Sequence, residues 1–357
     1  MTPDATTADL FPDLPVFAPL EKPQTRKKPK ALAPKPLPVP SPSMPPGAEP
    51  EALARALDAH PDYRVLRRLT PRLDWPNTPN TPNTPNTPGA LRLRVVVLDT
   101  ETTGLDASKD KIIELAMLRC DVDMATGLPV GQVQVFDELE DPGMPIPAEV
   151  QALTGIRDAD VAGKRLDMQR VAEMLDGADL VIAHNAGFDR PFCEARCALF
   201  QDIAWACSIA DMDWKAQGRS SQKLESLAQE LGLFYDAHRA DMDCHALLAV
   251  LTAPLPKDAA RNALATLITA SRQAAYRLSA TGAPFESKDR LKTRGYRWNG
   301  EQRVWQTRIG SDAALETELQ WLRAQVYGTR QASVALEQTD ALVRYSSRSG
   351  DFSERSL

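Results

Sequence analysis

Residues 91–105, LRLRVVVLDTETTGL, decide the fold. The segment starts as an alternation of apolar and basic residues and continues as a β-branched run at residues 95–97. This pattern is typical of a strand that enters the middle of a sheet. The strand ends in two acids, Asp99 and Glu101, two residues apart, so both side chains can lean toward one face. We therefore expect a pair of carboxylates at the end of a central strand.

The segments on the C-terminal side of this strand predict its neighbours. Further strands are expected at residues 111–121 and 132–138, after turn signals at Gly104 and Gly127, and a short buried strand at residues 179–183. Helical spacing of apolar residues predicts helices at residues 148–153, 168–175, 190–200, 224–231 and 241–251. Three consecutive strands followed by strand–helix alternation predict an α/β fold, with a mixed sheet flanked by helices.

Composition limits the classes of function. The chain has 357 residues, 43% of them hydrophobic, and a formal net charge of −6, so contacts with nucleic acid must be local rather than made through bulk positive charge. Its five cysteines form no CxxC pair, which argues against a structural zinc site or disulfide framework and favours a reducing cytoplasm. No segment has the length and apolar character of a membrane span, so we expect a cytoplasmic protein without a membrane partner.

Changes in composition divide the chain into four parts. Residues 1–90 form a Pro-rich, largely disordered arm with a short helical segment near residues 50–72, an extended NTPNTPNTPNTP linker, and a solvated RKKPK charge run at residues 26–30. The α/β domain follows at residues 91–255. Residues 256–330 are expected to hold a helix, at residues 259–279, and a basic aromatic accessory module, and residues 331–357 a flexible tail.

The accessory module has a local charge opposite to that of the whole chain. Residues 285–308, FESKDRLKTRGYRWNGEQRVWQTR, contain seven Lys or Arg and three acids, and Asn299-Gly300 predicts a hairpin turn. Two interpretations are open. The aromatic residues stack on unpaired bases beside phosphate-binding arginines, or they form the core of a small domain with an exposed basic face. The residues concerned are Tyr296, Trp298, Trp305, Arg294, Arg297, Arg303 and Arg308.

Further acids follow apolar segments elsewhere in the α/β domain. HNAGFD, residues 184–189, places Asp189 after the apolar run DLVIA, and AHRADMDCHALL places His238 five residues before Asp243, at the start of a helix. Converging carboxylates are the ligands that Mg²⁺ prefers. Each residue also has a structural alternative, because Asp189 or Asp241 can cap a helix and His238 can lie on a surface loop.

The order and spacing of these motifs resemble the DEDDh family of 3′-to-5′ exonucleases, over residues 94–251. The three motifs are residues 99–105, residues 184–189, and His238 followed by Asp243. Residues 146–156, IPAEVQALTGI, are also similar to the linking segment of the family. The five-residue interval of the family selects Asp243 rather than Asp241. The resemblance implies a ribonuclease-H-like fold.

The same resemblance implies a mechanism and a set of site residues. Two Mg²⁺ or Mn²⁺ ions would be held by four carboxylates, and a histidine would act as general base. The residues that match the metal ligands are Asp99, Glu101, Asp189 and Asp243, and the base is His238. The residues expected to bind the terminal nucleotides are Thr100, Thr102, Thr103, Gly104, Leu105, His184, Asn185 and Phe188.

We expect a metal-dependent exonuclease that releases nucleoside monophosphates from 3′ ends, with single-stranded DNA favoured. Three alternatives stay open: an exoribonuclease of the same family, a non-catalytic protein that binds nucleic acid or a polymerase, and a proofreading subunit. A polymerase or repair partner would bind through the tails.

Overall fold

The computed structural model describes residues 49–76 and 91–357. The expected arm, its RKKPK run and the NTP repeat lie outside these residues. The chain divides into two units, residues 1–57 and 58–357. Helix α1 (Pro50–Asp58) covers only the start of the segment expected to be helical near residues 50–72, and none of its residues is buried. The rest of that segment includes the short strand β1 (Arg67–Arg68), which pairs in parallel with β8 (Leu233–Phe234).

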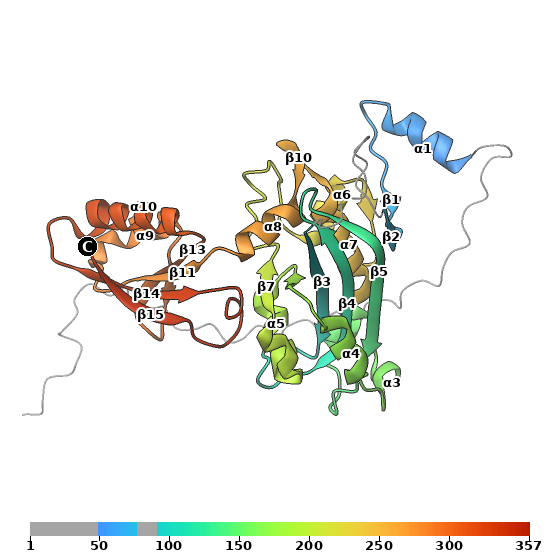
Figure 1. Ribbon diagram of the computed structural model, residues 1–357, viewed down its shortest axis with the longest axis horizontal. Helices are drawn as coiled ribbons and strands as arrows, with labels where there is room; N and C mark the ends of the chain where they lie inside the picture. The colour runs from blue at the N-terminus through green and yellow to red at the C-terminus, as the bar shows by residue number, and fades with distance from the viewer. Residues whose placement is uncertain (1–48, 77–90) are drawn as a thin grey trace, which may run out of the picture. The chain divides into compact units, whose positions relative to one another are not determined.

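A six-stranded mixed sheet forms the centre of the α/β domain (Figure 1). Its order is β2-β5-β4-β3-β6-β7, in which β2, β5, β4 and β3 are antiparallel neighbours and β3, β6 and β7 run parallel. The three consecutive strands and the later buried strand are confirmed. The bounds are β2 (Asp74–Trp75), β3 (Arg92–Thr102), β4 (Ile112–Asp123), β5 (Leu128–Leu139), β6 (Leu180–Ala183) and β7 (Ala204–Cys207).

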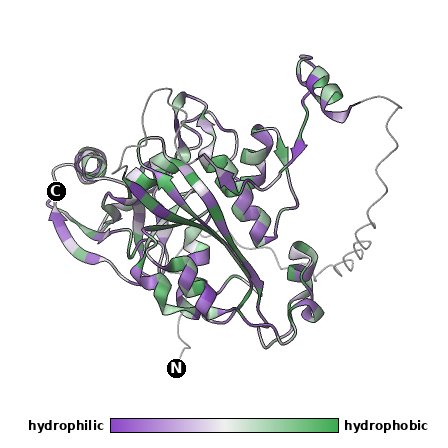
Figure 2. Ribbon diagram, turned by 45° about the vertical axis from the view of Figure 1, so that its right-hand side comes forward, coloured by the Kyte–Doolittle hydropathy of each residue, from purple (hydrophilic) through white to green (hydrophobic). Residues whose placement is uncertain are grey.

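Both faces of this sheet are covered by helices. Along β3, Val95 and Val97 belong to one buried cluster and Val96 and Leu98 to another, as the two-residue period of a strand requires. Figure 2 shows hydrophobic residues along these central strands. The first cluster includes residues of α6 (Leu224–Glu230), α7 (Ala240–Thr252) and α8 (Ala263–Ser271), and the second includes residues of α4 (Met168–Leu175) and α5 (Ala186–Arg196).

Two expected helices are corrected. The helix expected at residues 190–200 begins earlier, at Ala186, and gives way to a 3₁₀ turn, η2 (Ala198–Asp202), so Asp189 lies inside it. The helix expected at residues 259–279 is instead β10 (Asp258–Asn262), α8 and β11 (Ala275–Ala280). The Asn262 side chain accepts a hydrogen bond from the amide of Ala265 and so caps the N-terminus of α8. The remaining short elements are α2 (Ala148–Thr154), α3 (Asp158–Val161) and β9 (Pro254–Leu255).

The C-terminal region forms a second, antiparallel sheet in the order β12-β13-β11-β14-β15. The chain order β11-α9-β12-β13-α10-β14 is the β-α-β-β-α-β arrangement of ferredoxin-like units, and β15 adds one edge strand. The expected hairpin at Asn299-Gly300 joins β12 to β13 and is confirmed. The bounds are η3 (Phe285–Ser287), α9 (Lys288–Arg294), β12 (Arg297–Asn299), β13 (Val304–Ile309), α10 (Asp312–Leu322), the π-helical turn η4 (Arg323–Tyr327), β14 (Ser333–Thr339) and β15 (Asp351–Ser356).

The residues expected to form a flexible tail, 331–357, instead complete this sheet. β14 and β15 pair with each other, and the segment between them packs against the α/β domain. Within the described residues, no helix is long and apolar enough to cross a membrane. The ribonuclease-H-like fold class, a mixed sheet between helices with a small additional C-terminal domain, is confirmed.

Candidate active site

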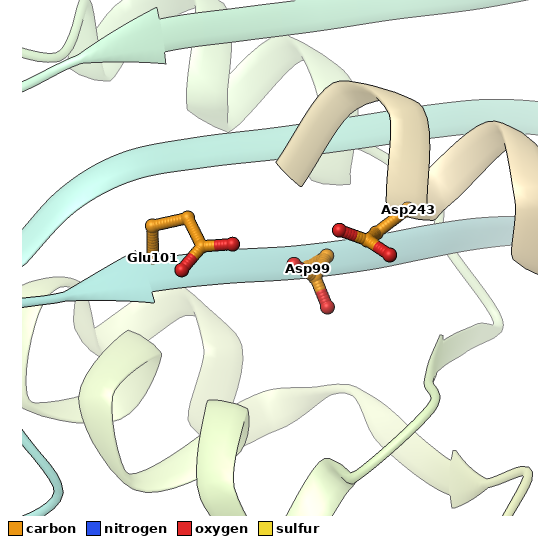
Figure 3. Close-up of side chains that lie close together, drawn as sticks. All are labelled: Asp99, Glu101 and Asp243. Atoms are coloured by element: carbon orange, nitrogen blue, oxygen red, sulfur yellow. The ribbon is translucent and has the colours of Figure 1, made fainter. Parts of the chain in front are cut away.

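Three acids from two elements meet at one end of the central strand. Asp99 and Glu101 extend from β3, and Asp243 extends from the first turn of α7 (Figure 3). Among the described residues, carboxylate oxygens of these three side chains lie within 4.8 Å of one another. Each of the three side chains is partly exposed, so the group is open to a ligand. The expected pairing of the strand-end acids with Asp243 is therefore present.

The fourth expected acid, Asp189, lies beside this group but outside its 4.8 Å limit. It sits in the first turn of α5 with 2% of its surface exposed. The buried Thr100 hydroxyl donates a hydrogen bond of 2.8 Å to Asp189. This hydrogen bond ties β3 to α5, and the expected contact of Thr100 with substrate stays a prediction.

Burial and mutual repulsion raise the proton affinity of these carboxylates. Burial, followed by the charges of Asp189, Asp243 and Glu101, raises the pKa of Asp99 well above its ordinary value. Burial and the charge of Asp243 raise the pKa of Glu101 to about 8. Burial raises the pKa of Asp189 to about 7, against the Thr100 hydrogen bond, which lowers it. Like charges held this close need a counter-charge or protons near neutral pH.

The donor set fits divalent cations of the magnesium type. Hard cations prefer carboxylate oxygens, and the group offers three such side chains at short mutual distance, with Asp189 next to them. A bound cation would supply the counter-charge that the raised pKa values of Asp99 and Glu101 call for. The three acids therefore form a candidate metal site.

The start of α7 is held in place by hydrogen bonds to two acids. Asp243 accepts hydrogen bonds of 2.8 Å from the Tyr235 hydroxyl and from the backbone amide of His238. Glu114 on β4, with 0% of its surface exposed, accepts hydrogen bonds from the Arg239 guanidinium and the Ala240 amide. These contacts fix the helix that carries Asp243 against the sheet that carries Asp99.

His238 precedes α7 rather than lying in it, so the interval to Asp243 is not a helical one. Its φ is +64°, a left-handed conformation that few residues other than glycine adopt, and its side chain is exposed. Strained conformations of this kind cluster at functional sites. The neighbouring Asp241 pairs with His245 at 3.5 Å and is absent from the carboxylate group, which agrees with the choice of Asp243.

The loop after β3 is compact, with one side chain directed to solvent. The Thr102 hydroxyl donates to the Gly104 carbonyl, and the Thr103 hydroxyl contacts Asp110. A Cβ atom on Gly104 would lie 2.4 Å from an Asp110 carboxylate oxygen, so any larger residue there would displace the Asp110 side chain. Leu105 is 87% exposed, so its side chain contributes little to the packing of the fold.

In the second motif His184 is partly buried, Asn185 is exposed, and Phe188 packs against a neighbouring ring. Burial lowers the pKa of His184 to about 4, and its Nδ1 contacts the Ser208 hydroxyl at 2.6 Å. Asn185 is exposed, and its side chain makes no capping hydrogen bond to α5. Phe188 packs on Phe192 with ring centroids 5.1 Å apart, so much of its surface is in contact with the hydrophobic core.

Sequence reasoning missed the residues that support this site. Glu114 and Tyr235 had no motif to mark them. Arg190, directly after Asp189, has a fully buried guanidinium that donates to the carbonyl oxygens of Ala341, Leu342 and Arg344. Glu114 and Arg190 act on residues that are far away in the sequence, and spacing along the chain does not report such contacts. Tyr235 lies only eight residues before its partner Asp243, but a tyrosine at that interval is no recognised pattern.

The aromatic residues of the accessory module belong mostly to its own core. Tyr296 is 2% exposed and donates to Glu318, so it is not available to stack on bases. Trp305 packs against the same core and meets Trp298 edge to face, with centroids 5.6 Å apart. Trp298 is 53% exposed. The small-domain interpretation, with an exposed basic face, fits better than base stacking.

Comparison with known proteins places the same region in one family. The RNase_T family, described as exonuclease, matches residues 96–251. DNA polymerase III subunit epsilon of Treponema pallidum is 31% identical over 174 residues, which is 46% of this chain and 77% of that protein. An epsilon-like protein of Rhodobacter capsulatus is 42% identical over 105 residues, 28% of this chain but 14% of the relative.

Two further similar proteins match over a small part of their own length or with a low TM-score. DNA polymerase III PolC-type of Streptococcus agalactiae is 38% identical over 102 residues, which cover 28% of this chain and 6% of that protein. A solved structure of exonuclease X with 5′ overhanging duplex DNA has 25% identity and a TM-score of 0.34, over 44% of this chain and 89% of that chain.

A mixed sheet between helices, with carboxylates gathered at the end of its central strand, defines a nuclease-type phosphodiester hydrolase. Within that class, the chain belongs to the DEDDh family of 3′-to-5′ exonucleases.

Proposed function

We propose that this exonuclease removes nucleoside monophosphates from the 3′ ends of single-stranded DNA, with Asp99, Glu101, Asp189 and Asp243 holding two Mg²⁺ or Mn²⁺ ions. The observation that carries the proposal is the 4.8 Å group of Asp99, Glu101 and Asp243 carboxylates. Two such cations make water more acidic and offset the negative charge that develops on the phosphoryl group. The similarity to a DNA polymerase III subunit supports DNA as the substrate.

In this proposal His238 acts as the general base. Its exposed imidazole removes a proton from the attacking water, whose oxygen forms a bond to phosphorus. The bond from phosphorus to the 3′ oxygen of the preceding nucleotide then breaks, and that oxygen takes a proton from solvent. The hydrogen bond from the His238 amide to Asp243 holds the base next to the carboxylates.

The substrate residues have separate tasks in the proposal. Leu105, exposed at the end of the compact 102–105 loop, packs against the last base step. Asn185 offers a free polar side chain at the start of α5. Thr102, Thr103 and Gly104 fix the backbone that presents Leu105, and His184 stays neutral near pH 7 because its pKa is about 4.

A time course on 5′-labelled single-stranded DNA and on RNA of the same sequence tests this function. With Mn²⁺ we expect a ladder that shortens from the 3′ end, faster on DNA, and none with EDTA or with Asp99→Ala. Preferred cleavage of RNA in competition would identify an exoribonuclease instead. Intact substrate in every lane would contradict the proposal and favour a binding protein.

The proofreading alternative makes a different prediction. The similarity to a DNA polymerase III subunit and to an epsilon-like protein supports a polymerase partner that binds the tails. Co-purification of the full chain with DNA polymerase III of its own species, lost when residues 1–48 are deleted, would support that role. Degradation at an unchanged rate with and without the polymerase would favour an independent exonuclease.

A further inference from the structure

The C-terminal sheet has one face covered by helices and one open face. Leu278 and Ala280 of β11 are buried in the cluster that includes residues of α9 and α10. Because side chains alternate along a strand, Arg277 and Ser279 lie on the opposite face. The register continues this face across β13 and β12, where Arg308 lies opposite Arg277, and Gln306 lies opposite Ser279 and Arg297.

Three arginines line a shallow groove on this open face, here called the arginine face: Arg277, Arg297 and Arg308. Gln306, Thr307 and Gly295 complete the lining. No acid and no large apolar side chain belongs to this lining, so the groove is suited to a negatively charged partner rather than to an apolar one.

The charges of the arginine face are only partly balanced within the chain. The Arg277 guanidinium pairs with Glu337 at 2.7 Å, whereas the Arg308 guanidinium lies over the Tyr345 ring, 5.2 Å from its centroid. Within the described part of the chain, Arg297 has neither an ion pair nor a side-chain hydrogen bond. Like charges directly opposite each other destabilise a sheet, and Glu337, opposite Arg277 on β14, offers one negative charge against the two neighbouring arginines Arg277 and Arg308.

Side-chain hydrogen bonds connect the three strands that carry these arginines. Gln306 donates to the Ser279 hydroxyl at 3.0 Å and accepts from Asn299 at 3.2 Å. These bonds join the outward side chains of β11, β13 and β12 into one surface. A rigid sheet with fixed polar groups loses little freedom when a ligand binds.

We propose that the arginine face is a second nucleic-acid site, which binds the phosphodiester backbone of a single strand independently of sequence. Guanidinium groups bind phosphates through paired N–H donors. Aromatic stacking is not part of this site, because Tyr296 is buried in the core on the other side of the sheet. The choice of nucleic acid over other polyanions rests on the proposed function, in which the same protein degrades such strands.

Binding without cleavage tests this inference separately from the exonuclease activity. The full chain is titrated into a fluorescein-labelled dT₂₀ oligonucleotide in EDTA, and the anisotropy is followed at several salt concentrations. The double variant Arg297→Ala/Arg308→Ala removes two charges from the arginine face. The control Lys288→Ala/Lys292→Ala removes two exposed charges from α9, on the helical side of the sheet. Circular dichroism verifies that both variants are folded.

We expect the arginine variant to bind roughly tenfold more weakly, and its salt slope to fall by about 1.4, since each phosphate contact contributes about 0.7 for a single strand. The lysine control should bind as the unmodified protein does. Equal binding by the arginine variant, an equal loss in the control, or no binding by the unmodified protein would overturn the inference. Competition by a polyglutamate peptide as strong as that by unlabelled dT₂₀ would assign the face to acidic protein segments instead. None of these outcomes depends on whether the active site cleaves DNA.

Discussion

The Glu114 carboxylate, fully buried on β4, forms an ion pair of 2.7 Å with Arg239 and accepts a hydrogen bond of 2.9 Å from the Ala240 amide. A single acid thus joins the sheet to the first turn of α7. Because Asp243 lies in that turn and Asp99 lies on the neighbouring strand β3, the Glu114–Arg239 pair sets how closely the two carboxylates approach. Glu114 thus positions the site without belonging to the group of Asp99, Glu101 and Asp243.

Glu114→Ala should therefore lower both stability and activity. We expect a loss of about 2–4 kcal/mol in the free energy of unfolding, because the Arg239 charge and the Ala240 amide lose their buried partner. Urea denaturation measures the loss, and Mn²⁺ affinity should fall with it. Asp236→Asn, which breaks the exposed Arg68–Asp236 pair, is the control, with an expected change below about 1 kcal/mol. Equal Mn²⁺ affinity in Glu114→Ala and the unmodified protein would count against a positioning role.

The metal-free protein should lose stability as the pH rises. The folded-state pKa of Glu101, about 8, lies above the value of about 4.3 for an unfolded chain, so the folded state binds this proton more tightly. Its contribution to stability is complete below about pH 4 and is lost as the pH rises through about 8. In EDTA at pH 8, Glu101→Gln should stabilise the protein by roughly 1–2 kcal/mol, a value reduced for its partial exposure. Thermal melts at pH 5 and pH 8 test this, and a gain of equal size at both values would contradict it.

Removal of the His238 ring should slow hydrolysis and leave the affinity for metal ions unchanged. His238→Gly is the suitable variant, because glycine adopts a φ of +64° without strain. We expect turnover to fall by about 10²–10⁴-fold, the usual contribution of a general base, with Mn²⁺ affinity unchanged. Partial recovery of the rate with added imidazole would identify the ring as the missing group. His60→Ala, which removes another exposed histidine, is the control, and a His238→Gly enzyme with full turnover would exclude the assigned role.

Leu105→Ala should raise KM without destabilising the protein. Leu105 is 87% exposed, so folding gains little from it, whereas burying a leucine side chain against a base is worth up to about 1.5–3 kcal/mol. Steady-state rates on single-stranded DNA should show a KM that is several-fold to about a hundredfold higher, with an unchanged thermal midpoint. Leu153→Ala, at a leucine that is 55% exposed, is the matched control. Equal KM values for the two variants would show that Leu105 does not contact the substrate.

The sequence predicted the elements with strong local patterns. The β-branched run before Asp99 and the apolar run before His184 marked two adjacent strands of the sheet, β3 and β6, which are confirmed. The DEDDh spacing also selected Asp243 rather than Asp241, in agreement with the geometry. The strand predictions succeeded because periodicity is a property of neighbouring residues.

The predictions that failed depended on distant partners. All six residues of β15 are exposed, so this edge strand has no apolar alternation and resembled a flexible tail. The Arg190 guanidinium is buried because it donates to carbonyl groups of the segment after β14. No pattern in the sequence around Arg190 predicts this burial.

Titration with Mn²⁺ tests the central claim, that the strand-end carboxylates form a metal site. The electron paramagnetic resonance signal of free Mn²⁺ measures binding to the unmodified protein, to Asp99→Asn and to Asp241→Asn. Asp241 is the matched control, because it lies two residues from Asp243 and outside the carboxylate group. We predict about two bound ions for the unmodified protein and for Asp241→Asn, and a marked loss for Asp99→Asn. Equal binding by Asp99→Asn and the unmodified protein would contradict the account.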